Sequence, residues 1–270
     1  MTTLFGAQDA AAYVLQQTET GAEVHWPHTC VTWWMESLGC PDVTPDVTME
    51  TLKASFETWD TLEGVYVDFA GAGVSCVDTV GLDIGRAHNV VMWRSGVDAW
   101  PHTQRVVGLT TLTLDIDTGE IVDADMEFNS EDFTFATDGD GNAYDLQYAV
   151  THEIGHILGL DHSAVPSSVM YETADPGAVN KRKLAPDDIE GVMLNHGWAN
   201  APSTIQPCGT TAPQGTVEAP YCPPPPSSGC AGGGSHIPVT SLLLLATLWG
   251  VGRSRRRDLL LLAMSVGTAT

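Results

Sequence analysis

Three stretches of the chain carry the apolar spacing or the start signals of helices. From Pro45-Asp46 to about Thr61, apolar residues recur four and seven positions apart, as on the buried side of a helix. A second helix is predicted over 145–158, with Asp145 in the position of an N-cap. A third begins at Pro186, where the following acidic residues suit a first turn. The predicted buried positions of the first two helices are Leu52, Phe56, Trp59, Leu146, Val150, Ile154 and Ile157.

Short runs rich in β-branched and aromatic residues predict strands between these helices. A turn at Asp117-Thr118-Gly119 separates the last two runs, which are therefore expected to form a hairpin. The segments read as extended are 12–20, 23–35, 65–69, 89–93, 109–116 and 121–128.

The composition suits one globular domain with extensions. Of the 270 residues, 43% are hydrophobic and 8 are Trp, which is enough for a substantial core. The formal net charge is −23, and nearly all of the acidic residues precede residue 199. So acidic a body repels nucleic acid, and no Gly-rich phosphate loop is present in the sequence. The charge suits a secreted protein that must stay soluble.

The stretch HEIGHILGLDH places three histidines and a glutamate at a spacing suited to a metal. His152 and His156 are four residues apart, so one face of a helix presents both imidazoles to a single ion. Gly159 can adopt a left-handed conformation that ends the helix and lets His162 supply a third ligand. Zinc takes imidazole nitrogens, and a catalytic zinc keeps an open position for water. Glu153 then lies where a general base for that water belongs.

This motif, continued by Ser163, resembles the metzincin metalloproteases and, within them, the matrixin branch. Met170, eight residues past His162, is similar to the Met-turn that lies beneath the zinc in this clan. Glu172 departs from the pattern, since matrix metalloproteases usually carry proline there. The resemblance runs from about residue 12 to Trp198 and implies a peptidase domain over 12–198.

The resemblance implies an α+β fold of the metzincin type: a twisted, mostly parallel mixed sheet with an antiparallel edge strand, backed by the helices at 46–61 and 145–158. It implies a zinc-dependent endopeptidase acting on protein or peptide substrates. One catalytic zinc would be held by His152, His156 and His162. Glu153 would take the proton of the zinc-bound water and pass it to the leaving amine.

The segment 121–129 looks like the metzincin edge strand that pairs with an extended substrate, with Ala124, Asp125 and Met126 at its centre. An ordinary half-polar strand is the alternative interpretation of the same pattern.

A possible calcium site is formed by Asp138, Asp140 and Asn142, whose D-x-D-x-N spacing resembles the front of a calcium loop. It lacks the distal bidentate Glu, and a polar turn explains the residues equally well. No His lies between 129 and 152, so ligands for the structural zinc of the vertebrate matrix enzymes are not expected here.

Six cysteines fit an oxidising compartment better than the cytosol. Spacing cannot fix their connectivity, but local pairing of Cys208 with Cys222 is the favoured expectation. Cys30, Cys40 and Cys76 either supply one more bridge or are buried as small hydrophobic residues.

The C-terminal region changes character after the domain. Residues 199–229 are rich in Pro, Ser, Thr and Gly and predict a semi-rigid linker. Residues 230–257 combine a Cys-Gly element, a short apolar run and an Arg cluster, which resembles the bacterial sorting tails called Myxo-CTERM. That resemblance implies export to the surface or exterior of a bacterium, with the membrane as a partner of the tail. Residues 258–270 stay unassigned.

The N-terminus does not read as a secretory signal, because Met1 to Ala12 has no basic residue and Asp9 interrupts its apolar run. The natural chain is therefore expected either to begin upstream or to have been trimmed. We expect a monomer. Two alternatives stay open: a cell-wall peptidase, and a surface-displayed zinc-binding or adhesion module without turnover. The intact Glu153 argues against the second, because a pure binder needs no base.

Overall fold

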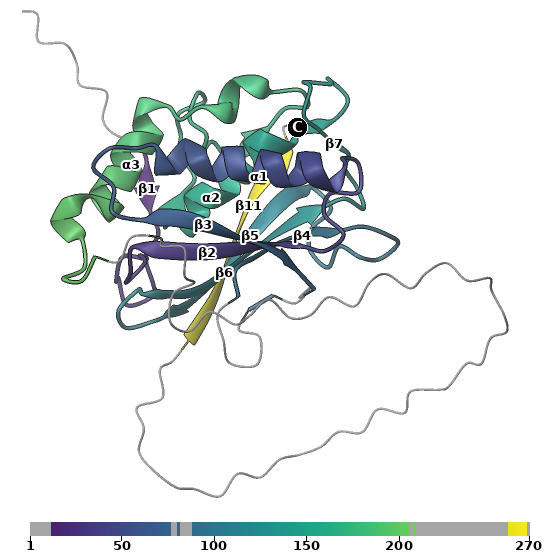
Figure 1. The fold of residues 1–270 in the computed structure, drawn as a ribbon. Helices are drawn as coiled ribbons and strands as arrows, with labels where there is room; N and C mark the ends of the chain where they lie inside the picture. The colour runs from purple at the N-terminus through teal and green to yellow at the C-terminus, as the bar shows by residue number, and fades with distance from the viewer. Residues whose placement is uncertain (1–11, 77–79, 82–87, 206–207, 209–258, 269–270) are drawn as a thin grey trace, which may run out of the picture.

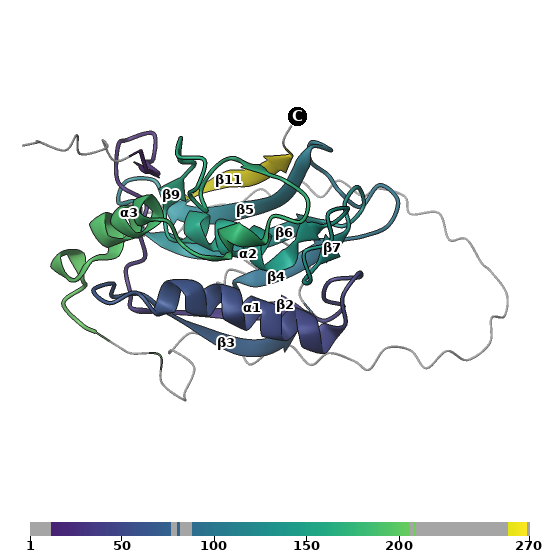
Figure 2. The ribbon, with the colours of Figure 1, turned by 90° about the horizontal axis from the view of Figure 1, so that it is seen from above.

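The computed structural model describes residues 12–76, 80–81, 88–205, 208 and 259–268, and the structural statements below concern these residues. A mixed sheet is covered on one face by two helices, α1 (Pro45–Asp60) and α2 (Leu146–Ile157), which pack against each other (Figures 1 and 2). Both helices begin and end within about two residues of their predicted bounds.

Five strands of the sheet come from the first half of the chain, in the spatial order β5-β6-β4-β2-β3. Strands β2, β3, β4 and β6 run parallel, and β5 is antiparallel to β6. The sequence-based expectation of a mostly parallel mixed sheet is therefore confirmed. The bounds are β2 (Cys30–Glu36), β3 (Asp68–Ser75), β4 (Val90–Arg94), β5 (Val106–Asp115) and β6 (Ile121–Asn129).

Two further strands extend this sheet beyond β5. The strand β11 (Leu259–Thr268) lies antiparallel to β5, and β10 (Thr173–Ala174) lies parallel to β11. Smaller elements complete the described fold. They are β1 (Val14–Leu15) with β9 (Leu160–Asp161), β7 (Phe135–Ala136) with β8 (Tyr144–Asp145), the 3-10 helices η1 (Val179–Arg182) and η2 (Trp198–Asn200), and α3 (Pro186–His196).

The apolar stripes predicted for the helices form the core against the sheet. All seven predicted helix positions are buried, including Leu52 and Phe56 of α1. Trp33 of β2 stacks on Phe56 with ring centroids 4.4 Å apart, which joins the sheet to α1. The indole N–H of Trp59 donates to the carbonyl of Thr151 at 3.0 Å, which joins α1 to α2. The helix that carries the histidines is therefore held on both sides by packed side chains.

The prediction that 121–129 is the substrate-pairing edge strand is wrong. Strand β6 lies between β5 and β4, so both of its edges are already paired: Ala124 lies opposite Leu112, and Met126 lies opposite both Thr110 and Val91. The hairpin turn reverses the chain after β5, so β6 returns alongside β5. The other edge of β6 then pairs with β4, which leaves β5 on the outside of the five strands. The antiparallel strand at the border of the five-stranded sheet is β5.

The alternating pattern of β6 was misleading because its acidic face is buried as well. Asp125 accepts hydrogen bonds from the main-chain N–H groups of Gly81 at 2.7 Å and Val90 at 2.9 Å. Asp123 accepts the N–H of His88 at 2.6 Å. These carboxylates bind neighbouring main chain instead of facing solvent, which a pattern of alternating polarity cannot reveal.

The favoured pairing of Cys208 with Cys222 is also wrong. Cys208 forms a disulfide with Cys30, with their Cα atoms 5.0 Å apart and a sequence separation of 178. Cys40 is a free, buried thiol, which matches the alternative that it is a small hydrophobic residue of the core. Cys76 is disulfide-bonded. The bridge ties the chain that follows η2 to the start of β2.

The predicted sorting tail at 230–257 lies outside the described residues. Among the helices that the structure does describe, none combines the length and apolar character needed to cross a membrane.

Candidate metal centre

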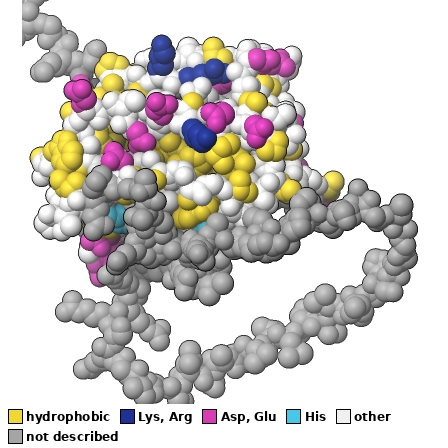
Figure 3. Space-filling model, viewed as in Figure 1, with side chains coloured by type: hydrophobic (Ala, Val, Ile, Leu, Met, Phe, Trp, Pro, Cys, Tyr) yellow, Lys and Arg dark blue, Asp and Glu magenta, His cyan; other side chains and the backbone are white. Residues whose placement is uncertain are grey.

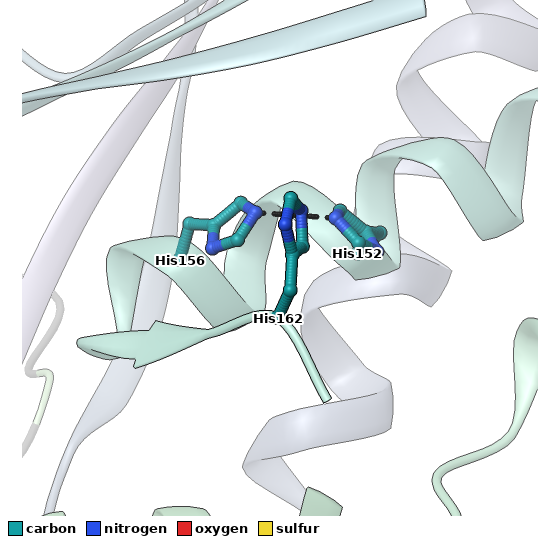
Figure 4. A group of neighbouring side chains, drawn as sticks. All are labelled: His152, His156 and His162. Atoms are coloured by element: carbon teal, nitrogen blue, oxygen red, sulfur yellow. Dashed lines mark hydrogen bonds between the residues drawn. The ribbon is translucent and has the colours of Figure 1, made fainter. Parts of the chain in front are cut away.

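Three imidazoles converge at the end of α2. His152 and His156 lie one helical turn apart, and their Nε2 atoms are 3.1 Å from each other. The ring of His162 faces both, with centroid distances of 5.3 Å to His152 and 5.0 Å to His156 (Figure 4). One ligand atom from each of the three lies within 4.8 Å of the others. The sequence-predicted ligand set is thus brought together.

Main-chain carbonyls orient two of these rings. The Nδ1 atom of His152 lies 2.7 Å from the carbonyl oxygen of Val169, and that of His156 lies 2.8 Å from the carbonyl oxygen of Leu160. A carbonyl can only accept, so each Nδ1 must carry a proton. Each Nε2 of a neutral ring then presents a lone pair to the other. Two lone pairs at this distance suit a shared cation.

Burial keeps these rings neutral, which is the form that binds a metal. Desolvation, followed by the neighbouring histidines, lowers the pKa of His152 well below its ordinary value. The same causes lower the pKa of His156 to about 3. Two imidazoles bound to one tetrahedral zinc at ~2.0–2.1 Å have nitrogens about 3.3 Å apart, close to the spacing found here. The residues present therefore fit zinc.

The turn at Gly159 brings the third histidine back to the other two. Gly159 has φ +75°, and a Cβ on it would lie 2.2 Å from the carbonyl oxygen of Val24. The predicted left-handed glycine is therefore confirmed, and the close approach of Val24 adds a second reason for it. The side-chain amide of Gln16 donates to the carbonyl of Leu160 at 2.7 Å and so supports the same turn.

Met170 packs against α2 in a turn held by one carboxylate. Its side chain is buried against Gly155, where a Cβ would come within 2.1 Å of the methionine sulfur. Asp188, at the start of α3, accepts the N–H groups of Val169 at 2.9 Å and Met170 at 3.1 Å. It also accepts the hydroxyl of Ser168. The carbonyl of Val169 orients the ring of His152. Asp188 therefore supports the metal site indirectly, by holding the main chain of Val169.

Glu153 is completely buried between α2 and β5. Its Oε2 accepts the hydroxyl of Thr110 at 2.7 Å, and that hydroxyl also lies 3.2 Å from its main-chain oxygen. A Cβ on Gly108 would lie 2.9 Å from Oε1, so a side chain there would displace the carboxylate. Sequence reasoning missed Thr110, Gly108 and Asp188. Only the position of Asp188 in a helix first turn gave any signal.

The three candidate calcium ligands form a turn that is bonded to itself. Asp138 accepts the N–H of Asp140 at 3.2 Å, and Asp140 accepts the main-chain and side-chain N–H groups of Asn142, both at 3.0 Å. These bonds match the polar-turn interpretation. Calcium stays a prediction, and a melting midpoint that is the same in calcium and in a calcium chelator would remove it.

The side of the molecule that carries α1 offers a different kind of surface. Acidic side chains are scattered over it among a few basic ones (Figure 3). A hollow of about 370 Å³ lies beside the N-terminal half of α1 and the start of α2. No ligand histidine lines it, so we do not place the chemistry there. Its lining residues are Asp46, Val47, Glu50, Thr51, Thr137, Gln147 and Arg182.

Comparison with known protein families decides the classification. The family model of the M10 peptidases, described as matrixin, matches residues 25–197, well over half of the chain and the whole of the site. The chain belongs to the matrixin family. The metzincin-type fold expected from the sequence is thereby confirmed, and zinc is the metal on which matrixins depend.

Curated relatives of this matrixin align with it over a shorter stretch. It is 40% identical to matrilysin of Rattus norvegicus over 76 residues, which is 28% of each chain. It is 44% identical to matrilysin of Homo sapiens over 61 residues, 23% of each chain. It is 32% identical to neutrophil collagenase of Homo sapiens over 96 residues, 36% of this chain and 20% of that relative. The chain thus spans about a quarter or less of the length of these relatives.

Proposed function

We propose that this chain is a zinc-dependent endopeptidase that hydrolyses peptide bonds of protein or peptide substrates, with Glu153 as its general base. The observation that carries the proposal is the placement of Glu153. α2 carries Glu153 directly after His152 of the three-histidine cluster, and the Glu153 carboxylate lies against β5, the border strand of the five-stranded sheet. Membership of a peptidase family supports the same conclusion.

The chain's own residues would share the work as follows. His152, His156 and His162 would hold the zinc, which would supply a water of lowered pKa, about 7, and an electrophile for the scissile carbonyl. Glu153 accepts a proton from the attacking water and returns it to the leaving amine. Thr110 holds the Glu153 carboxylate in place. The main chain of β5 binds the substrate in an extended conformation through its N–H and C=O groups.

Two variants separate the base from the ligands. In Glu153→Ala all three imidazoles remain, so zinc content should stay near that of the parent, while turnover falls by about 10²–10⁴. In His156→Ala a ligand is lost, so zinc content and turnover should fall together. Metal analysis and peptidase assays on the same preparations, with and without chelator, provide the test. Near-normal turnover in Glu153→Ala would sink the mechanism, and zinc binding without hydrolysis by the parent would favour a binding module.

We also propose that the protein is exported to the surface or exterior of a bacterial cell. The sequence of 230–257, with its apolar run and Arg cluster, supports this proposal, as does the disulfide between Cys30 and Cys208. Replacing the Arg cluster at 253–257 by Ser in an exporting host should change how the protein divides between the envelope fraction and the medium. An unchanged distribution would remove the sorting role of the tail.

A further inference from the structure

The border of β5 is occupied by another part of the same chain. Residues 259–268 form β11, which pairs with β5 from Leu259 opposite Asp115 to Gly267 opposite Val106. On its other side β11 pairs in parallel with β10, which follows the Met170 turn. The ten-residue strand thus lies between β5 and β10, and the ribbon views show it beside β5 (Figures 1 and 2).

The register places β11 at the level of the candidate catalytic carboxylate. Met264 lies opposite Thr110, whose hydroxyl donates to Glu153, and Val266 lies opposite Gly108, which closely approaches the same carboxylate. β11 also contacts α2, the helix that carries two of the histidines. The main chain of β11 therefore runs where the proposed function needs the main chain of a peptide substrate.

We propose that residues 259–268 occupy the peptide-binding edge of β5 within the same molecule and compete there with substrate. This inference rests on the proposed function only for the competition, not for the position of the strand. Two features favour such an occupant. The segment LLLLAMSVGT has no charged residue, so its pairing buries no ion beside this acidic domain. An uncovered β5 would also expose a row of unpaired N–H and C=O groups.

Competition within one molecule has a defined kinetic consequence. A peptide binds only to the fraction of molecules in which β11 has left the edge, so the apparent KM rises by the reciprocal of that fraction. Occupancy for nine-tenths of the time raises the apparent KM about tenfold and leaves kcat unchanged. Because strand and edge belong to one chain, the effect does not depend on protein concentration.

The test compares two forms of the full chain loaded with zinc. Met264→Pro with Ser265→Pro removes two successive main-chain N–H groups. Successive N–H groups of a strand point to opposite edges, so one of the two faces β5. Met264→Ala with Ser265→Ala changes the same side chains and keeps both N–H groups. We expect the proline form to show faster hydrogen exchange across 106–115 and a KM lower by about threefold or more, at equal kcat. The alanine form should match the parent.

Each outcome bears on one claim. Equal exchange across 106–115 in the proline form and the parent overturns the position of the strand. Faster exchange with an unchanged KM overturns the competition. If the KM of the parent falls when the protein is diluted, the competing strand comes from a second molecule. That result overturns the claim that strand and edge belong to the same molecule. If all forms lack peptidase activity, the proposed function fails, while exchange still decides where β11 lies. Should the proline pair fail to fold, Leu261→Pro with Leu262→Pro repeats the comparison.

Discussion

Thr110 of β5 donates its hydroxyl to the Oε2 of Glu153 at 2.7 Å, across the boundary between the sheet and α2. Both side chains are completely buried. A buried carboxylate needs donors to hold it in place, and a hydrogen bond to a charged group contributes about 1.5–3 kcal/mol. The strand that we expect to bind substrate therefore also positions the base.

Replacing Thr110 by Val keeps the shape of the side chain and removes this donor. We expect kcat/KM to fall by about 10–100-fold, which corresponds to the loss of one such hydrogen bond. Zinc content should not change, since the hydroxyl of Thr110 bonds to Glu153, which is not a ligand. Thr110→Ser retains the hydroxyl and should recover most of the activity. Activity in Thr110→Ser as low as in Thr110→Val would show that packing, and not the hydrogen bond, is responsible.

Asp188 should couple the Met170 turn to metal affinity. Replacing it by Asn leaves one oxygen to accept where two accepted before, so N–H groups of the turn lose their partner. Val169 then holds His152 less firmly, and we expect zinc affinity to fall about 10–100-fold. Titration against a competing chelator measures this loss. Glu190→Gln, an exposed change on the same helix, is the matched control and should leave the affinity unchanged.

The sequence predicts the three metal ligands, but it does not predict the main-chain groups that orient them. The spacing of His152, His156 and His162 on a helix and a glycine turn is local, so geometry follows from it. The carbonyls of Val169 and Leu160 that orient two rings are main-chain groups, and any residue type supplies a carbonyl. Their role appears only when the turns are placed in space.

The wrong predictions share another physical cause. Which strand of a hairpin borders a sheet depends on where the partner strand pairs next, and β6 pairs with β4 from an earlier part of the chain. The bridge between Cys30 and Cys208 likewise joins residues 178 positions apart. Patterns read along a few neighbouring residues contain no record of such long-range contacts. The occupant of β5 was missed for the same reason.

Asp60, the last residue of α1, should make stability depend on pH. Burial raises the pKa of its carboxyl to about 7, the N–H of Phe69 partly offsets this, and the charges of Asp68 and Glu57 raise it further. The folded protein then holds a proton that the unfolded chain releases above about pH 4. The stabilising contribution is complete below that pH and is lost as pH rises through about 7.

Asp60→Asn removes this titration and keeps an oxygen that can accept the N–H of Phe69. We expect the variant to match the parent at pH 4 and to exceed its free energy of unfolding by about 2–4 kcal/mol at pH 8. Denaturant unfolding of zinc-loaded protein at both pH values measures the difference. Glu63→Gln removes an exposed negative charge nearby and serves as the control. A gain of the same size at pH 4 and pH 8 would refute the titration.

Gly159 should be among the least replaceable glycines of this chain, because two independent constraints meet there. An alanine at φ +75° is strained by about 1–2 kcal/mol. Its Cβ would in addition lie 2.2 Å from the carbonyl oxygen of Val24 and 2.7 Å from the amide nitrogen of Asn195.

We therefore expect Gly159→Ala to lower the melting midpoint by about 5–10 °C and to weaken zinc binding, since His162 follows the displaced turn. Gly141→Ala is the matched control: a Cβ there would meet no atom within 4 Å, and its melting midpoint should stay close to that of the parent. Thermal unfolding with and without zinc separates the two effects. If Gly159→Ala lost stability but bound zinc as tightly as the parent, the turn would support the fold without placing the third ligand.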